Sequence, residues 1–150
     1  MLALIPRPPL GVPARHTVIG VETNVGDRGV IVAVVTDADT ALVLGSGGLA
    51  VLGTPRLLAW CEAATCRALE GRLPPGSSSV GTAVALEHIA ASAVGEQVTV
   101  VGVVRSVAGR RVGFDVEATD AGGTVVGRGS VERVVVDDDR FLARLALDRS

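Results

Sequence analysis

A single charged residue lies between Leu57 and Cys66 in an apolar stretch that is predicted to be helical, LLAWCEAATCRAL at residues 57–69. This residue, Glu62, has no Lys or Arg three or four positions away, where its helical neighbours would lie. Burying an isolated carboxylate costs several kcal/mol, so a buried one must find a tertiary partner or bind a proton. Both outcomes recur at catalytic sites.

The alternative for Glu62 is exposure to solvent. The apolar face of the helix would consist of Leu57, Cys61, Ala64 and Ala68. Because Glu62 lies about 100° from Cys61 around the helix, it is not part of that face.

His88 is one of two histidines, and it lies in a stretch with the alternation of a strand. The alternation over residues 79–91 places on one side Val80, Thr82, Val84, Leu86 and His88. That side is expected to face the core and the helix, so that Glu62 and His88 approach the same seam. A carboxylate beside an imidazole is the pair that acid–base or nucleophilic chemistry needs. The alternative is a histidine that only hydrogen-bonds within the core.

Thr54 and Pro55 mark the predicted start of the helix, since Thr is a favoured N-cap and Pro is favoured at the first helical position. The helix should end near residue 70, with Gly71 as its stop. Capping alone would explain Thr54. Its hydroxyl would also lie beside free backbone N–H groups, where a developing oxyanion can be held.

The remaining patterns predict a sheet that positions these residues. The predicted strands are residues 29–36, 79–91, 96–106, 110–119 and 124–136. Within the fourth of these, the inward residues are Val112, Phe114, Val116 and Ala118. One strand, one long helix and four meandering strands predict an α+β domain, an antiparallel sheet with the helix on one face. A sheet this apolar and covered on one side only is expected to pair with a second copy.

Composition restricts the partners. The net charge is −2 and the 14 Lys and Arg residues are scattered, so no basic stripe indicates nucleic acid or an anionic membrane. No run of 18 apolar residues predicts a spanning helix. Residues 1–24 are expected to be a poorly ordered, Pro-rich extension, followed by the domain at residues 25–150. Prolines break up any signal-peptide pattern, so a cytoplasmic protein with reduced cysteines is expected.

No motif indicates a metal or redox cofactor, since CxxC, HExxH and GxSxG are absent from the sequence. The glycine-rich GSGGLAVLG at residues 45–53 lacks the GK[ST] of a phosphate loop. The three aspartates at residues 137–139 are expected to cap a helix over RFLARLAL instead of binding a metal.

Four segments together resemble the fluoroacetyl-CoA thioesterase family of hotdog-fold proteins. They are GTPRLLAWCEAATCRAL, GSSSVGTAVALEHIAASAVGEQVTV, RSVAGRRVGFDVEATD and GRGSVERVVVDDDRFLARL. The most specific part is a Thr with a Glu eight positions later, then Gly-Thr-Ala with a His seven positions after its Gly. The resemblance implies a hotdog fold, a meandering antiparallel sheet wrapped around one long helix, and side-by-side dimers with active sites at the interface.

The resemblance also implies the site residues. It gives Thr54, Glu62 and His88 as catalytic, and Gly81 and Arg133 as substrate-binding. Since eight residues span about 12 Å of helix, Thr54 and Glu62 of one chain should not touch, and cooperation would need two copies. The family places phenylalanines shortly before the Thr, whereas residues 45–53 contain no aromatic residue, so the acyl preference stays open.

The resemblance thus implies a cofactor-free homodimer, with pairing into tetramers left open, that hydrolyses an acyl-CoA or acyl-carrier-protein thioester. Glu62 would act as nucleophile or as base for water, and His88 would polarise the substrate and assist the departing thiolate. Thr54 would orient these groups or transiently accept the acyl chain. The alternatives are a hotdog dehydratase or hydratase, and a non-catalytic acyl-binding or scaffold domain.

Overall fold

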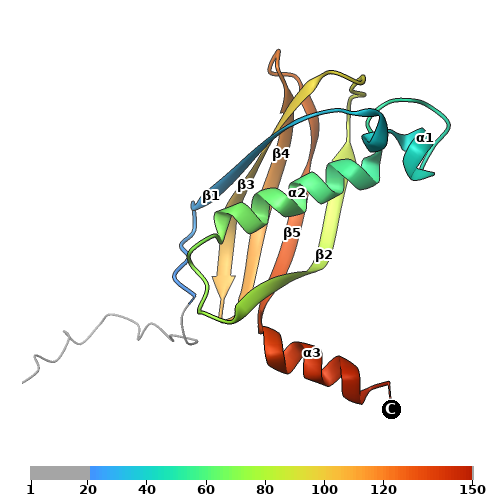
Figure 1. Cartoon of the computed structure of the whole chain (residues 1–150). Helices are drawn as coiled ribbons and strands as arrows, with labels where there is room; N and C mark the ends of the chain where they lie inside the picture. The colour runs from blue at the N-terminus through green and yellow to red at the C-terminus, as the bar shows by residue number, and fades with distance from the viewer. Residues whose placement is uncertain (1–20, 150) are drawn as a thin grey trace, which may run out of the picture.

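The computed structural model describes residues 21–149, which form one antiparallel sheet with a long helix along one face (Figure 1). The elements are β1 (Arg28–Val34), the 3-10 helix η1 (Asp37–Asp39), α1 (Ala41–Leu44), α2 (Thr54–Ala68), β2 (Ser77–His88), β3 (Gln97–Ala108), β4 (Arg111–Asp120), β5 (Val125–Asp137) and α3 (Asp138–Leu147). The strand order is β1-β3-β4-β5-β2, and all four neighbouring pairs are antiparallel. The predicted α+β architecture is therefore confirmed.

The core lies between α2 and the sheet. The residues predicted to form the apolar face of the helix are all buried: Leu57, Cys61, Ala64 and Ala68. They belong to one cluster with sheet residues that include Val98, Val100, Val104, Val112, Phe114, Val116 and Ala118. The predicted inward set of β4 is thus confirmed as well. β-Branched valines suit the pleated surface of a strand, and their burial is the main force that holds helix and sheet together.

Two glycines that lie directly opposite each other, Gly29 in β1 and Gly102 in β3, allow α2 to rest on the sheet backbone. A Cβ at Gly29 would overlap the carbonyl oxygen of Ala64 and the amide nitrogen of Ala68. A Cβ at Gly102 would lie 3.2 Å from backbone atoms of Ala64 and Thr65. The absence of side chains at these two positions therefore sets the height of the helix above the sheet.

A β-bulge in β2 decides which of its residues face the helix. The pairing of β2 with β5 shifts between Gly81 and Ala83, which makes Thr82 the extra residue. Gly81 and His88 are seven residues apart, so strict alternation would place them on opposite faces. With the extra residue, both face α2, where Gly81 lies beside Glu62 and His88 contacts the head of the helix.

The predicted side assignment for residues 79–91 is therefore wrong before the bulge. Val80 and Thr82 line a hollow beside α3 together with Val134 and Val136, and do not share the face of His88. The sequence does contain one indication of this change, because an isolated glycine inside a strand pattern is typical of a bulge.

Side-chain caps begin the two shorter α-helices. The hydroxyl of Thr40 accepts a hydrogen bond from the amide of Val43 at 3.3 Å at the start of α1. The carboxylate of Asp137 accepts one from the amide of Arg140 at 2.9 Å at the start of α3. The capping role predicted for the three aspartates is thus confirmed for Asp137, whereas Asp138 and Asp139 lie in the first turn of α3. None of the helices within residues 21–149 combines the length and apolar character needed to cross a bilayer, and the cytoplasmic location stays a prediction.

Most of the expected Pro-rich extension, residues 1–24, lies outside the described residues. Within its last part, the amide of Glu22 donates to the carbonyl of Arg72 at 3.0 Å, and that of Asn24 to the carboxylate of Asp27 at 2.8 Å. The domain boundary at residue 25 stays a prediction, although these bonds attach residues 22–24 to the domain.

Substituting Gly29 with alanine should destabilise the fold, because the added methyl group would collide with the backbone of α2. We expect a loss of about 1–3 kcal/mol in the free energy of unfolding, the usual cost of overpacking a core. Urea denaturation measures this loss. Gly48→Ala is the matched control, since a Cβ at Gly48 meets no atom within 4 Å. Equal losses in the two variants would contradict the close approach of helix and sheet.

Candidate active site

Thr54 is the first residue of α2 and not its cap. The N-cap is Gly53, which has extended backbone angles and accepts a hydrogen bond from the amide of Leu57 at 3.1 Å. The predicted cap is therefore wrong by one residue, because glycine is also an acceptable N-cap and precedes Thr54. The Thr54 hydroxyl lies 2.8 Å from Nδ1 of His88.

His88 favours the neutral form of its ring. Partial burial lowers the pKa of His88 below the usual 6.5, and the nearby backbone of Ala90 offsets part of this effect. If the proton is on Nε2, then Nδ1 accepts a hydrogen bond from Thr54; in the other tautomer Nδ1 donates one. Nε2 is buried and has no hydrogen-bond partner of good geometry among residues 21–149. Because buried polar atoms are normally hydrogen-bonded, we expect Nε2 to bind a group that is not among these residues.

Glu62 is partnered by Arg133 of β5. The Nη1 atom of Arg133 donates to Oε2 of Glu62 at 3.3 Å, and the side chains are 7% and 38% exposed, respectively. The carboxylate thus has the tertiary partner that was one of the outcomes predicted for it, and it is partly and not wholly solvated. Within the described part of the chain, Glu62 and His88 share no hydrogen bond or ion pair.

Gly81 provides the space that the carboxylate occupies. A Cβ at this position would lie 2.6 Å from Oε2 of Glu62 and 3.6 Å from Nη1 of Arg133. Gly81 is also the register partner of Arg133 in the β2–β5 pair. The two residues that the resemblance gave as substrate-binding therefore surround Glu62.

Arg133 is held by a residue that the sequence analysis did not identify. Its Nε donates to the hydroxyl of Ser79 at 2.8 Å, and its Nη2 donates to the carbonyl of Ser79 at 2.9 Å. Ser79 ends a run of three serines that carries no signal of its own. The available indication was its position two residues before Gly81, on the same face of the strand.

The site residues form two groups at different heights along α2. Thr54 and His88 meet at the first residue of the helix, whereas Glu62 meets Arg133 eight residues later, about 12 Å along the axis. A base must come within about 3 Å of the proton that it removes. In a single chain, therefore, the carboxylate and the imidazole do not act on each other directly.

Cys61, the neighbour of Glu62, adds no nucleophile. Burial, and to a smaller extent the charge of Glu62, raises the pKa of the Cys61 thiol from 9.0 to about 11. The thiol therefore stays protonated at neutral pH and is a poor nucleophile. Cys61 and Cys66 are both free thiols, as expected.

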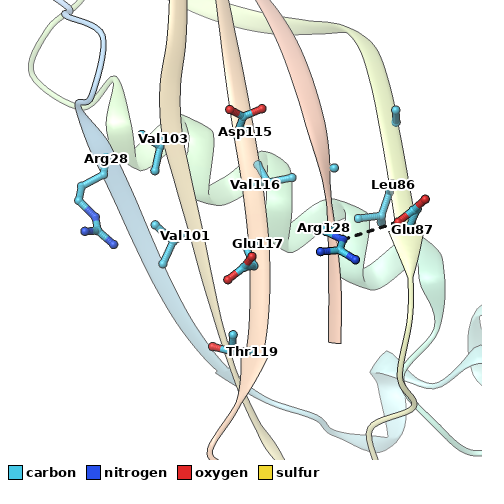
Figure 2. Close-up of a pocket in the computed structure, with 12 residues that line it drawn as sticks. Arg28, Leu86, Glu87, Val101, Val103, Asp115, Val116, Glu117, Thr119 and Arg128 are labelled. Carbon is cyan, nitrogen blue, oxygen red and sulfur yellow. Dashed lines mark ion pairs between the residues drawn. The ribbon is translucent and has the colours of Figure 1, made fainter. Parts of the chain in front are cut away.

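Two hollows lie on the face of the sheet opposite α2. Figure 2 shows one of them, whose lining includes Val101, Val103, Glu117 and Arg128. An ion pair of 3.7 Å between Arg128 and Glu87 borders it. The other lies between α3 and strands β2 and β5. Neither is lined by any of the three predicted catalytic residues, so these hollows do not serve the two groups on α2.

Comparison with known proteins decides the family. The family model described as fluoroacetyl-CoA-specific thioesterase matches residues 35–139, which include all five predicted site residues. The chain belongs to this family. The fluoroacetyl-CoA thioesterase of Streptantibioticus cattleyicolor is 39% identical to it over 95 residues, which cover 63% of this chain and 68% of that protein.

Solved structures agree with the family. A variant of the fluoroacetyl-CoA thioesterase FlK in complex with acetyl-CoA has a TM-score of 0.78 at 32% identity, covering 85% of this chain and 100% of that one. A hot-dog-like protein from Thermanaerovibrio acidaminovorans has a TM-score of 0.79 at 29% identity, covering 85% and 94%. The hotdog fold and the thioesterase family, both implied by the sequence resemblance, are therefore confirmed.

Acid should destabilise the domain through His88. Because its pKa is lower in the folded than in the unfolded chain, the unfolded chain binds this proton more readily. Stability therefore falls as the pH drops through about 6.5 and then through the folded pKa. The variant His88→Asn keeps a polar side chain but cannot titrate in this range.

We expect the wild type to lose more free energy of unfolding than His88→Asn between about pH 7.5 and about pH 5. Urea denaturation of both proteins at the two pH values gives the comparison. If both lost the same amount, the lowered pKa of His88 would be contradicted.

Proposed function

We propose that this protein hydrolyses acyl-CoA thioesters to the free acid and CoA, with Glu62, His88 and Thr54 around the reacting carbonyl. The observation that carries the proposal is the Glu62 carboxylate, which Arg133 binds through Oε2 in the space left by Gly81. Among the described residues this leaves Oε1 available to a substrate. Membership of the thioesterase family supports the reaction, and the FlK variant bound to acetyl-CoA supports CoA as the carrier.

In the proposed reaction, Glu62 either attacks the thioester carbonyl itself or removes a proton from a water that attacks it. In the first route, water then hydrolyses the acyl–glutamate anhydride. In both routes the C–S bond breaks and the thiolate needs a proton. His88 with its proton on Nε2 would polarise the carbonyl and relay to the thiolate a proton that the water releases in either route, so that the ring ends as neutral as it began. Thr54 would donate to Nδ1 and orient the ring, or transiently accept the acyl chain.

A dimer would bring the two groups together. Strand β2 is an edge of the sheet, and its sequence SSSVGTAVALEH has Glu87 as its one acidic residue and no Lys or Arg to discourage pairing. Two antiparallel copies of β2 would run in opposite directions. His88 of one copy would then approach the Ser77–Gly81 end of the other, where Glu62 lies. We propose that each site combines Glu62 of one protomer with His88 and Thr54 of its partner.

The segment before α2 supports a broad preference for short acyl groups. Its exposed large residues are aliphatic, namely Leu42, Val43, Leu44 and Leu49. Since no aromatic side chain stands there to enclose a very small group, we expect fluoroacetyl-CoA to be one substrate among several.

The two alternatives are less well supported. A scaffold domain would use Thr54 only as a cap and leave Glu62 solvated, whereas Gly53 is the cap and Glu62 is paired. A dehydratase or hydratase would also use a carboxylate and an imidazole, but the family is that of thioesterases.

A panel of acyl-CoA substrates with detection of free thiol tests the reaction. We expect thiol release by the wild type and a fall in kcat of roughly 100-fold or more in Glu62→Gln and in His88→Ala, the usual contribution of acid–base groups. Glu87→Gln is the matched control, because Glu87 adjoins His88 but is 75% exposed. Hydration of an enoyl-CoA without thiol release would favour the dehydratase, and binding without turnover would favour the scaffold.

Mixing two inactive variants tests the shared site. In a mixed dimer of Glu62→Gln and His88→Ala, one of the two sites would contain both intact residues. After random exchange of protomers we expect activity to recover to roughly a quarter of the wild-type value, since half of the dimers are mixed and each has one intact site. If the activity of the mixture stayed at the level of the separate variants, Glu62, His88 and Thr54 of one site would belong to a single chain.

A further inference from the structure

The guanidinium of Arg133 connects Glu62 to a single residue of β2. Two of its nitrogens, Nε and Nη2, donate to the hydroxyl and the carbonyl of Ser79 at 2.8 and 2.9 Å. The third, Nη1, donates to Oε2 of Glu62 at 3.3 Å. Arg133 is 6% exposed, so little of it is in contact with water. Ser79 and Glu62 therefore lie at opposite ends of one buried, planar donor group.

We propose that Ser79 is a positioning residue for thioester hydrolysis, acting through Arg133 to hold the Glu62 carboxylate in place. The inference depends on the proposed function, because it assigns the reaction to Glu62. The hydroxyl of Ser79 sets the orientation of the guanidinium plane, and Nη1 then meets Oε2 at one defined point. Neither Ser79 nor Arg133 needs to contact the reacting carbonyl for this role.

The planarity of the guanidinium makes the connection effective. Its N–H groups form a rigid fork, so two bonds on one side determine where the donors on the other side point. Without the Ser79 hydroxyl, the guanidinium would keep only its hydrogen bond to the Ser79 carbonyl on this side, and it could rotate about that bond. Glu62, a flexible side chain that is 38% exposed, would then take up several positions. Misplacement of a catalytic group by about 1 Å can cost up to 100-fold in rate.

Gly81 makes the position of the carboxylate more exact. It follows Ser79 by two residues and faces the same side of β2, where its missing Cβ leaves the room that Oε2 occupies. Ser79 thus acts on the guanidinium while Gly81 acts on the carboxylate. The short segment of β2 before the bulge supplies both effects.

A matched pair of variants tests the hydroxyl alone. Ser79→Thr keeps it and Ser79→Val replaces it with a methyl group, while both are β-branched and suit a strand. We expect kcat for acetyl-CoA to fall by about tenfold in Ser79→Val and to stay within about twofold of wild type in Ser79→Thr, with KM changed by less than about twofold in both. Ser78→Ala is the control, since Ser78 is exposed and alternates to the other face.

The outcomes separate this inference from the proposed function when Glu62→Gln is measured beside them. Equal kcat values in Ser79→Val and Ser79→Thr, with Glu62→Gln inactive, would overturn the positioning role and leave the function in place. An active Glu62→Gln would overturn both. A loss in Ser79→Val that matches its unfolded fraction, taken from thermal denaturation at the assay temperature, would make the role of Ser79 one of stability only and would also overturn the inference.

Discussion

Helix α2 lies so close to the sheet that its backbone rests on two facing glycines, Gly29 and Gly102. With small Ala64 and Ala68 on the helix side, helix and sheet meet with almost nothing between them. This contact fixes the height of α2 over the other strands as well. The contact therefore sets the distance that any side chain of the sheet must span to reach α2. Both groups of site residues depend on this distance, because both lie along the same helix.

The buried arginine adds a second requirement. A guanidinium out of water is costly unless its donors find acceptors. Arg133 finds them in Ser79 and in Glu62, so the carboxylate that we assign to the reaction also compensates a buried charge. Glu62 thus contributes both to the stability of the fold and to the proposed reaction. The site can hold Glu62 firmly because the fold itself benefits from keeping it there.

Most of the fold could be predicted from periodicity, because the spacing of apolar residues in each helix or strand shows which of its faces is buried. The buried face of α2 and the inward residues of β4 both followed from spacing alone. The partner of Glu62 could not be found in this way, since Arg133 is 71 residues further along the chain and periodicity does not report contacts between elements. The cap was misplaced because Gly53 and Thr54 are both suitable residues for it.

The extra residue in β2 makes the length of this strand matter independently of its composition. If a natural relative kept this spacing of Gly81 and His88 but had one more residue in β5 opposite Thr82, regular pairing of the two strands could continue, yet the imidazole would turn to the face of the sheet opposite Gly81. Such a chain would retain the glycine and the carboxylate but would have to recruit its proton donor from elsewhere. The presence or absence of this bulge in the pairing of β2 with β5, too small a change to alter the fold, would thus distinguish lineages that share an architecture from those that share a reaction.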